Sequence, residues 1–230
     1  MAQDLPSSKT FLNTNLLINL PEDLGLVLEI GCGSGAMAAE YKKNNVNSIW
    51  HGMESDADAL KLAKKNLNHA WKIDLNDFKP NATMKKKKYD ALVYSLTMEQ
   101  LNQPLESLEA HLKLLKKQGQ LFFCISNIQH WSLIRHLISG NWENSDKGIL
   151  YEDNNQFYTR KSFIDLLNKA GLKVTALKRY SYEKSPIFRA RRGTRIKTLE
   201  KLKEFCADTK LYYNENDFRT YHFVIAAERK

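Results

Sequence analysis

The stretch LVLEIGCGSG, from Leu26 to Gly35, decides the fold. Its first five residues are mostly apolar, which is typical of a short buried strand, and three glycines follow at alternate positions. Glycine lets the backbone turn tightly and lie against a ligand, and a helix is expected to follow from about residue 34 to residue 44. A strand, a glycine loop and a helix in this order are typical of nucleotide-binding α/β folds.

Strands and helices alternate along the rest of the chain. Strands are expected at residues 26–30, 48–53, 70–73, 91–94, 121–125, 173–180 and 221–227, and a leading helix at 11–20. The alternation predicts a Rossmann-like, doubly wound α/β fold. We expect a mostly parallel seven-stranded sheet with an antiparallel last strand and helices on both faces.

Capping residues predict where several helices begin and end. Ser55 and Thr159 are expected to cap helices that follow them, and Thr194 is expected to cap a later helix. Pro104 is suited to the first turn of another helix, which Gly119 is expected to end.

The length of 230 residues fits a single domain, 1–230, better than two. Two stretches exceed what a minimal α/β unit needs, at about 126–158 and 183–219. Long connections in compact domains usually serve function. The first begins at the carboxyl end of a strand and is expected to form a substrate lid. The second is basic and is interpreted as a partner surface or a cap.

Composition excludes several classes of protein. Hydrophobic residues make up 43% of the chain, which is enough for a core, and no apolar run approaches the ~20 residues of a membrane span. The start of the sequence shows no signal peptide. Cys32, Cys124 and Cys206 are far apart and form no CxxC pair, so we expect no disulfide framework, no metal site and a cytoplasmic location.

Three acidic residues lie in or directly after the first three predicted strands. Glu54 ends the second strand, where a carboxylate can hold the two hydroxyls of a ribose, and Asp74 ends the third, where it can accept an adenine amino group. Glu29 lies two residues before Gly31. It would repel a pyrophosphate and attract a cationic ligand, and a charge pair at about 4 Å in a shielded site is worth a few kcal/mol. Alternatively, Glu29 caps backbone amides and Asp74 caps a turn.

These features resemble the class I S-adenosylmethionine-dependent methyltransferases. The resemblance runs from Leu26 to about Lys178, and it rests on VLEIGCGSG, Glu54, Asp74, the strand start YDALV at 89–93, MEQLNQP at 98–104 and GQL at 119–121. It implies S-adenosylmethionine as cofactor, with S-adenosylhomocysteine as product. The cofactor site is expected to comprise Glu29, Gly31, Cys32, Gly33, Gly35, Glu54, Ser55, Asp74, Leu75 and Ser95.

One bacterial subgroup, associated with cell-surface glycan synthesis, looks closest. Its members carry S-x-P-N-x-x-H-W and then G-L-L-D-x-T-H-x-R-F-F-T, and here the chain reads SNIQHW at 126–131 and GILYEDNNQFYT at 148–159. His130, Trp131, Phe157 and Thr159 match these patterns. The Asp, His and Arg of the second pattern are replaced by Tyr151, Asn154 and Gln156. Gln100 also replaces the His of the subgroup's LEHL stretch.

The resemblance implies methyl transfer by in-line displacement at a sulfonium. An oxygen acceptor also needs a base, for which His130 is the first candidate and Glu99 and Asp153 are alternatives. His130 can equally pack beside Trp131. The neighbouring aromatic residues of the lid, Trp142, Phe157 and Tyr158, either stack on a substrate or pack the lid.

We therefore expect a methyltransferase that acts on a small molecule or glycan. The net charge of +9, the pI near 9.3 and the cluster Arg189, Arg191, Arg192 and Arg195 keep open a nucleic-acid or protein substrate, although the cluster also suits a solvated helix start. The altered lid keeps open a weakly catalytic protein that serves a partner. A nucleotide-dependent oxidoreductase is the last alternative.

Overall fold

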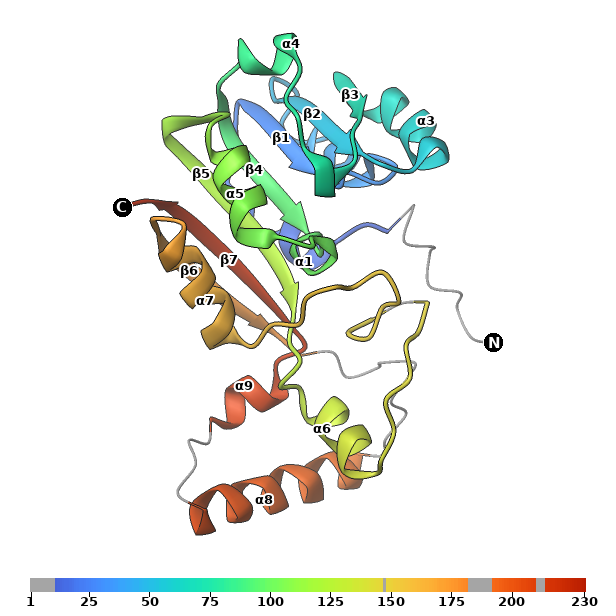
Figure 1. Ribbon diagram of the computed structural model, residues 1–230, viewed down its shortest axis with the longest axis vertical. Coiled ribbons are helices and arrows are strands. Elements are labelled where there is room, and N and C mark those ends of the chain that lie inside the picture. The colour runs from blue at the N-terminus through green and yellow to red at the C-terminus, as the bar shows by residue number, and fades with distance from the viewer. Residues whose placement is uncertain (1–10, 147, 182–191, 210–213) are drawn as a thin grey trace.

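The computed structural model describes residues 11–146, 148–181, 192–209 and 214–230, with helices packed around a central sheet (Figure 1). The strands are β1 Leu26–Ile30, β2 Ile49–Glu54, β3 His69–Lys72, β4 Tyr89–Ser95, β5 Leu115–Ser126, β6 Leu172–Tyr180 and β7 His222–Arg229. In the described chain they form one seven-stranded sheet of order β3-β2-β1-β4-β5-β7-β6. β7 is antiparallel to β5 and β6, and the other pairs are parallel. The predicted Rossmann-like fold is confirmed.

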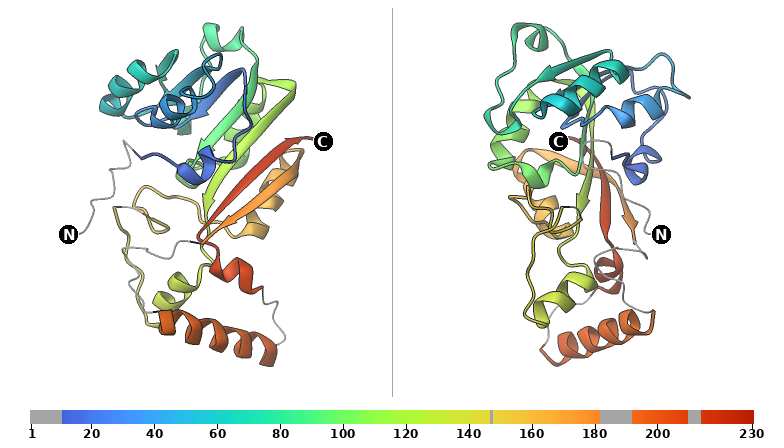
Figure 2. Two further views of the ribbon diagram at one scale, coloured as in Figure 1. Left: turned by 180° about the vertical axis from the view of Figure 1, so that it is seen from behind. Right: turned by 90° about the vertical axis from the view of Figure 1, so that its right-hand side faces the viewer.

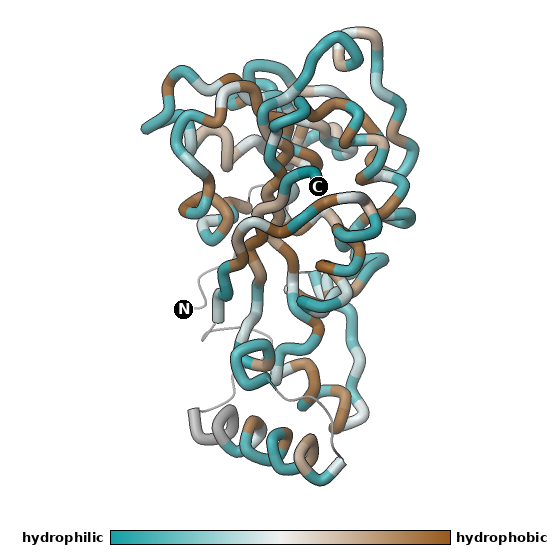
Figure 3. The backbone as a smooth tube through the Cα atoms, turned by 90° about the vertical axis from the view of Figure 1, so that its left-hand side faces the viewer, coloured by the Kyte–Doolittle hydropathy of each residue, from teal (hydrophilic) through white to brown (hydrophobic). Residues whose placement is uncertain are grey.

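Helices cover both faces of the sheet. They are α1 Thr14–Leu17, α2 Ala36–Tyr41, α3 Ala57–Asn66, α4 Ala82–Lys85, α5 Pro104–Leu112, α6 Trp131–Ile138, α7 Arg160–Lys169, α8 Arg192–Asp208 and α9 Glu215–Arg219, with 3-10 turns η2 Leu75–Asp77 and η3 Met98–Gln100. Side chains of α5 and α7 pack on one face, and those of α1, α2 and α3 on the other. The hydrophobic stretches in Figure 3 accordingly follow the central strands. The glycine loop therefore lies between β1 of the central sheet and α2.

One predicted helix end is wrong. The sequence predicts that the helix from Pro104 ends at Gly119, but α5 ends at Leu112 and Gly119 lies within β5. The pairing of β4 with β5 shifts register in this region, and a Cβ on Gly119 would lie 2.5 Å from a methyl carbon of Leu115. Glycine is therefore required here by a close approach in an irregular part of the sheet, not by a helix terminus.

Helix starts are partly as predicted. Thr159 caps α7, and its side chain accepts a hydrogen bond from the amide of Ser162, as expected. Ser55 does not cap α3, because the Asp56 carboxylate accepts from the amides at 58 and 59 instead. Thr194 lies inside α8 rather than before it.

A lower lobe extends from the carboxyl ends of the parallel strands (Figures 1 and 2). It is built from both predicted insertions, because α6 follows β5 whereas α8 and α9 lie between β6 and β7. Arg189 and Arg191 of the predicted cluster lie outside the described residues. No helix in the described ranges is both long enough and apolar enough to cross a bilayer.

Buried polar contacts attach this lobe to the sheet. Asn127, fully buried just after β5, donates from Nδ2 to the carbonyl oxygens of Asp217 and Thr220, each at 2.8 Å. The carboxylate of Asp217 in α9 accepts from Arg160 Nε at 2.9 Å and from Arg179 Nε at 3.3 Å. One buried acid thus joins α9 to the start of α7 and to the end of β6.

Replacing Asp217 with Asn keeps its shape and removes its charge. We expect the free energy of unfolding to fall by about 2–4 kcal/mol, because two arginines then lose their counterion. Urea unfolding monitored by circular dichroism measures this change.

Glu215→Gln, on the same helix, is the matched control. Glu215 pairs with Arg219 in an exposed i,i+4 contact, so its loss should cost less than ~0.5 kcal/mol. Equal costs for the two variants would mean that Asp217 does not anchor the lobe.

Candidate active site

The glycine loop adopts a conformation that only glycine tolerates easily. Gly31, Gly33 and Gly35 have φ values of +70°, +52° and +73°. A Cβ on Gly31 would lie 2.8 Å from the hydroxyl of Thr97, which donates to the carbonyl of Ile30 at 2.8 Å. The end of β1 is thereby tied to the turn after β4.

Glu54 holds the loop from the next strand. Its Oε2 accepts from the amide of Gly33 at 2.8 Å, and its Oε1 accepts from the amide of Asp56, also at 2.8 Å. The Ser55 hydroxyl is turned back toward the same carboxylate, 3.4 Å from Oε1. A carboxylate has about four acceptor positions, so the two amide bonds and the longer Ser55 contact leave one position free, and a ribose hydroxyl that replaced Ser55 would use a second.

Glu29 is the most unusual group in the site. Its side chain is 2% exposed, and Oε2 has no hydrogen-bond partner among the described residues. Burial, followed by the nearby charge of Glu54, raises the pKa of Glu29 from 4.5 to about 8. A buried carboxyl oxygen without a partner is costly, and a bound cation would remove that cost.

Asp74 and Leu75 lie at the end of β3. Asp74 is exposed and caps η2, with Oδ1 accepting from the amide of Asn76 at 2.9 Å. Leu75 is buried, and its Cδ1 would lie 3.4 Å from a Cβ on Gly31. Leu75 therefore packs against the glycine loop, and Asp74 is carried to the same edge of the sheet.

Cys32 serves packing. It is buried, and its sulfur would lie 2.5 Å from a Cβ on Gly52 of β2. Burial, together with the charges of Glu29 and Glu54, raises the pKa of the thiol, which makes it a poor nucleophile. The described residues contain no group of His, Cys, Asp and Glu side chains that could hold a metal ion.

Two residues that the sequence analysis misses support Ser95. Asn13, which is 2% exposed, caps α1 through Oδ1 and donates from Nδ2 to the Ser95 hydroxyl at 3.0 Å. Thr97 is the second of these residues, and its hydroxyl lies 3.4 Å from the carbonyl oxygen of Ser95. The sequence shows that Asn13 can cap the helix that follows it. The hydrogen bond between Asn13 and Ser95 joins residues far apart in the sequence, so no local pattern predicts it.

Glu99 is a second buried carboxyl with an unpaired oxygen. Its Oε1 accepts from the amide of Ser126 at 2.6 Å, whereas Oε2 has no partner among the described residues. Burial outweighs the hydrogen bonds from Ser126 and raises the pKa of Glu99 from 4.5 to about 7. The main-chain oxygen of Glu99 accepts from the amides of Asn155 and Gln156, so this residue joins the cofactor half to the lid.

The two other predicted catalytic residues have different surroundings. His130 is 2% exposed, lies at the start of α6, and its Nδ1 is 2.6 Å from the Ser132 hydroxyl. Its ring also packs against Trp131 and Tyr221. Asp153 is exposed and accepts from the Tyr151 hydroxyl at 2.5 Å.

Asn154 and Gln156, which depart from the glycan-subgroup pattern, form hydrogen bonds with backbone carbonyl oxygens, as does the neighbouring Asn155. The amide nitrogen of the Gln156 side chain lies 3.3 Å from the carbonyl oxygen of Asn102, and that of Asn154 lies 3.2 Å from the carbonyl oxygen of Ile149. Asn155 donates to the carbonyl of Gln100 at 3.0 Å. Asn155 and Gln156 therefore tie this stretch to the segment after β4, whereas Asn154 bonds within the stretch itself.

Comparison with known families identifies this arrangement. The family described as Methyltransferase domain matches residues 8–177, which include the glycine loop and all the acidic residues discussed for the cofactor half. The chain belongs to this family. The methyltransferase is thus an enzyme that uses S-adenosylmethionine, as the sequence predicts, and the unpaired buried oxygen of Glu29 fits this cationic cofactor. No curated protein matches the sequence.

Solved structures share the fold of the methyltransferase at low identity. A Haloferax volcanii protein in complex with the Trm112 methyltransferase activator is 13% identical, with 96% of this chain and 88% of that one covered and a TM-score of 0.61. A Mesorhizobium loti methyltransferase is 15% identical, with coverages of 94% and 96% and a TM-score of 0.61. Magnesium protoporphyrin IX methyltransferase from Synechocystis is 12% identical, with coverages of 92% and 76% and a TM-score of 0.57.

Replacing Glu29 with Gln tests whether this carboxyl is held at a cost to stability. The folded pKa of about 8 exceeds the ordinary 4.5, so stability is complete below pH 4.5 and is lost as the pH rises toward 8. Gln does not titrate, so Glu29→Gln should be more stable than the wild type near pH 8, by about 2–4 kcal/mol.

Unfolding midpoints of both proteins between pH 5 and pH 8 measure this difference, which should grow with pH. A Glu29→Gln protein that is less stable at every pH would show instead that the carboxylate stabilises the fold.

Proposed function

We propose that this methyltransferase transfers a methyl group from S-adenosylmethionine to an oxygen of a small-molecule or glycan acceptor. The observation that carries the proposal is the buried carboxyl of Glu29, unpaired at Oε2 beside the glycine loop. A buried acid without a partner is costly, and a cationic ligand removes that cost. An ammonium and a sulfonium are the charges that the methionyl part of the cofactor carries.

Each cofactor residue then has one task. Glu29 binds the ammonium, Glu54 accepts from the ribose hydroxyls, and Asp74 accepts from the adenine amino group at the edge of the sheet. Leu75 and the glycine loop exclude water from between these contacts, and Asn13 fixes the hydroxyl of Ser95. When bound, S-adenosylmethionine supplies a methyl group on an activated leaving group, so the protein mainly aligns the acceptor and keeps water out.

Glu99 is the best-placed base for an oxygen acceptor. An acceptor hydroxyl loses its proton during attack, and an unpaired carboxylate oxygen with a pKa of about 7 accepts a proton well near neutral pH. His130 is enclosed by Ser132, Trp131 and Tyr221. That environment favours a structural role for His130, and exposure makes Asp153 the weakest of the three candidates.

The proposed acceptor class rests on the resemblance to the glycan subgroup. The segments that carry its two patterns lie side by side, since the amide of Ile128 donates to the carbonyl oxygen of Tyr158 at 2.9 Å and Asn127 forms a β-bridge with Tyr158. The carboxamides at 154 and 156 bond to the backbone. We therefore infer an acceptor that differs from those of the subgroup in the polar groups it presents to the lid.

A second candidate function is weak catalysis in support of a partner protein. The altered lid favours it, and the Haloferax volcanii protein that shares this fold was solved with a methyltransferase activator. Turnover by the isolated chain, lost on removal of Glu29 or Asp74, would exclude this candidate.

The first measurement is calorimetric titration with S-adenosylhomocysteine, with NADH as control. We expect micromolar binding of the first ligand alone. Below pH 8 the free protein holds Glu29 protonated, so binding of an ammonium should release protons and the affinity should rise as the pH approaches 8.

Titration in two buffers of different ionisation enthalpy counts the released protons. Glu29→Gln should bind at least about tenfold more weakly and should release none through this group. Failure of the folded wild type to bind S-adenosylhomocysteine would refute the enzymatic proposal.

Replacing Glu99 with Gln separates catalysis from cofactor binding. We expect unchanged S-adenosylhomocysteine binding and a turnover lowered by about 10²–10⁴-fold, because the proton acceptor is lost. Release of S-adenosylhomocysteine during a screen of sugar nucleotides and glycans provides the assay.

The wild-type rate should fall below an apparent pKa near 7 as Glu99 becomes protonated. His130→Gln is the comparison variant and should reduce stability more than turnover. A fully active Glu99→Gln enzyme would show that Glu99 is not the base and would favour His130 instead.

A further inference from the structure

The end of β5 reaches beyond its neighbour β4. The parallel pairing of the two strands ends with Ser95 opposite Cys124, and the amide of Leu96 donates to the carbonyl of Cys124 at 3.0 Å. Beyond that pair, β5 runs on to Ser126 without β4 beside it. Glu99 Oε1 accepts the hydrogen bond of the Ser126 amide at 2.6 Å. A carboxylate therefore takes the place of a neighbouring strand at this point.

β7 holds the other side of the same segment. Ser126 lies opposite His222 in the antiparallel pair, and the amide of Asn127 donates to the carbonyl of Tyr221 at 2.9 Å. Neighbouring amides of a strand point to opposite sides, so the amide of Asn127 faces β7 and that of Ser126 faces Glu99. The contact with Glu99 thus depends on how firmly the chain is held at residue 127.

The side chain of Asn127 supplies this hold. It is fully buried, and its Nδ2 donates to the carbonyl oxygens of Asp217 and Thr220, each at 2.8 Å. Its Oδ1 accepts from the amide of Gln129 at 3.0 Å. Both hydrogens of the carboxamide and one lone pair of its oxygen are thereby used inside the protein. A buried polar group that is paired this completely is held in one orientation.

A base removes a proton only when its free oxygen lies within hydrogen-bond reach of that proton. On the basis of the proposed function, in which Glu99 is the base, we propose that Asn127 is a positioning residue for Glu99. It fixes the end of β5 so that the Ser126 amide bonds to Oε1 and leaves Oε2 free for an acceptor hydroxyl. The lower lobe thereby contributes to the reaction, because the carbonyl groups that hold Asn127 belong to α9 and its C-terminal cap.

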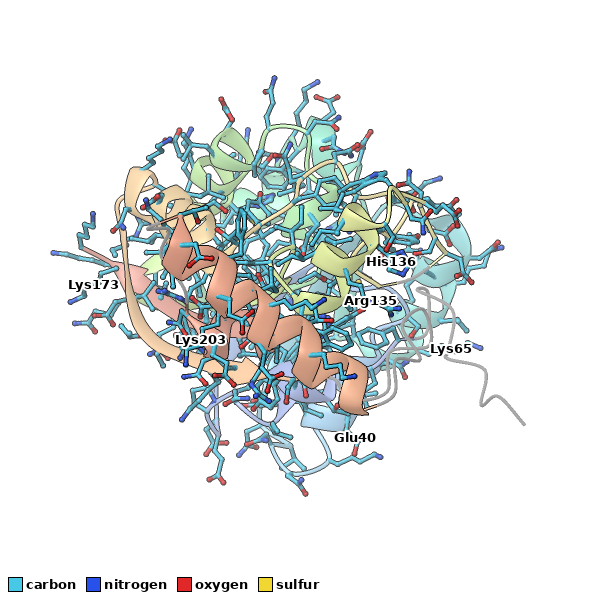
Figure 4. All side chains as sticks on the ribbon, turned by 90° about the horizontal axis from the view of Figure 1, so that it is seen from below. Glu40, Lys65, Arg135, His136, Lys173 and Lys203 are labelled. Atoms are coloured by element: carbon cyan, nitrogen blue, oxygen red, sulfur yellow. The ribbon has the colours of Figure 1, made fainter. Side chains whose placement is uncertain are left out.

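The described ionisable groups that face this region are uncharged near neutral pH. Burial raises the pKa of Tyr158 in the lid and of Cys124 in β5, and the charge of Glu99 raises both further. In β7, burial lowers the pKa of His222 to about 4. The charged Lys203 of α8 lies exposed on the outer surface of the lobe (Figure 4). Burial and hydrogen bonds therefore set the proton affinity of Glu99.

Asn127→Ala tests this inference in the full chain without any cofactor or acceptor. Once the end of β5 is released, the hydrogen bond that favours the charged form of Glu99 weakens, so the pKa of Glu99 should rise by about one unit above the wild-type value. Carbon-13 NMR of protein labelled at the glutamate carboxyl carbons follows this titration, and the resonance that is missing from Glu99→Gln assigns it. The Ser126 amide should also exchange with deuterium at least about tenfold faster.

Asp217→Asn is the matched control. It loosens the same lobe by removing the carboxylate that pairs with Arg160 and Arg179, but it keeps the main-chain carbonyl that accepts from Asn127. Both variants should therefore unfold at lower urea than the wild type. Only Asn127→Ala should change the titration of Glu99 and the exchange of the amide bonded to it.

Glu29 provides an internal control in the same spectra. It lies in β1, and its resonance, assigned with Glu29→Gln, should titrate alike in the wild type and in both variants. If Asn127→Ala does not fold, Asn127→Ser decides the question, because it keeps one uncharged donor and should give a smaller change of the same sign.

Two outcomes would overturn the inference. One is a pKa of Glu99 that is unchanged or lowered in the Asn127 variant, and the other is an equal rise in Asp217→Asn. Either would make Asn127 a structural anchor of the lobe and leave the proposed function standing. Failure of the wild type to bind S-adenosylhomocysteine would refute the proposed function without changing the titration of Glu99, so the two fail separately.

Discussion

The rest of the site depends on direct contact between the glycine loop after β1 and the turn after β4. Thr97 donates to the carbonyl of Ile30 at 2.8 Å, and a side chain at position 31 would collide with it. Parallel pairing of β1 with β4 forces their carboxyl ends to this edge of the sheet, and glycine is what lets them meet. The cofactor surface, the orientation of Glu54 and the position of Glu99 all depend on this contact.

Two buried carboxyls flank that contact, and they are electrostatically distinct. The charge that raises the pKa of Glu29 beyond the effect of burial is Glu54, whereas Glu99 responds to burial and to hydrogen bonds from Ser126. Each has an unpaired oxygen in the described structure, which costs stability that a fold alone would not retain. Glu29 lies in β1 and Glu99 in the turn after β4, so the proposed mechanism places ligand binding and proton transfer at the ends of different strands.

Much of the fold could be predicted because its signals are local. The glycine loop, the apolar strand before it and the cap at Thr159 each depend on residues adjacent in the chain. Local signals also mislead where the packing of a sheet competes, as at Gly119, which lies in β5 close to Leu115 of the same strand and to the Asp90 carbonyl of β4, not at a helix end. Ser55 has a capping side chain, yet Glu54 holds it and Asp56 caps the helix.

The sequence by itself determined the fold class and the family, because spacing along a strand–loop–helix unit is set by backbone geometry, and it also supplied the acidic residues of the proposed cofactor site. Only the tertiary structure decided which of those acids lack a partner. It also decided that His130 is enclosed and Glu99 is not fully paired, and that Asn127 bonds to carbonyl groups at the end of α9. Burial and pairing are properties of residues far apart in the chain, and no spacing along the sequence records them.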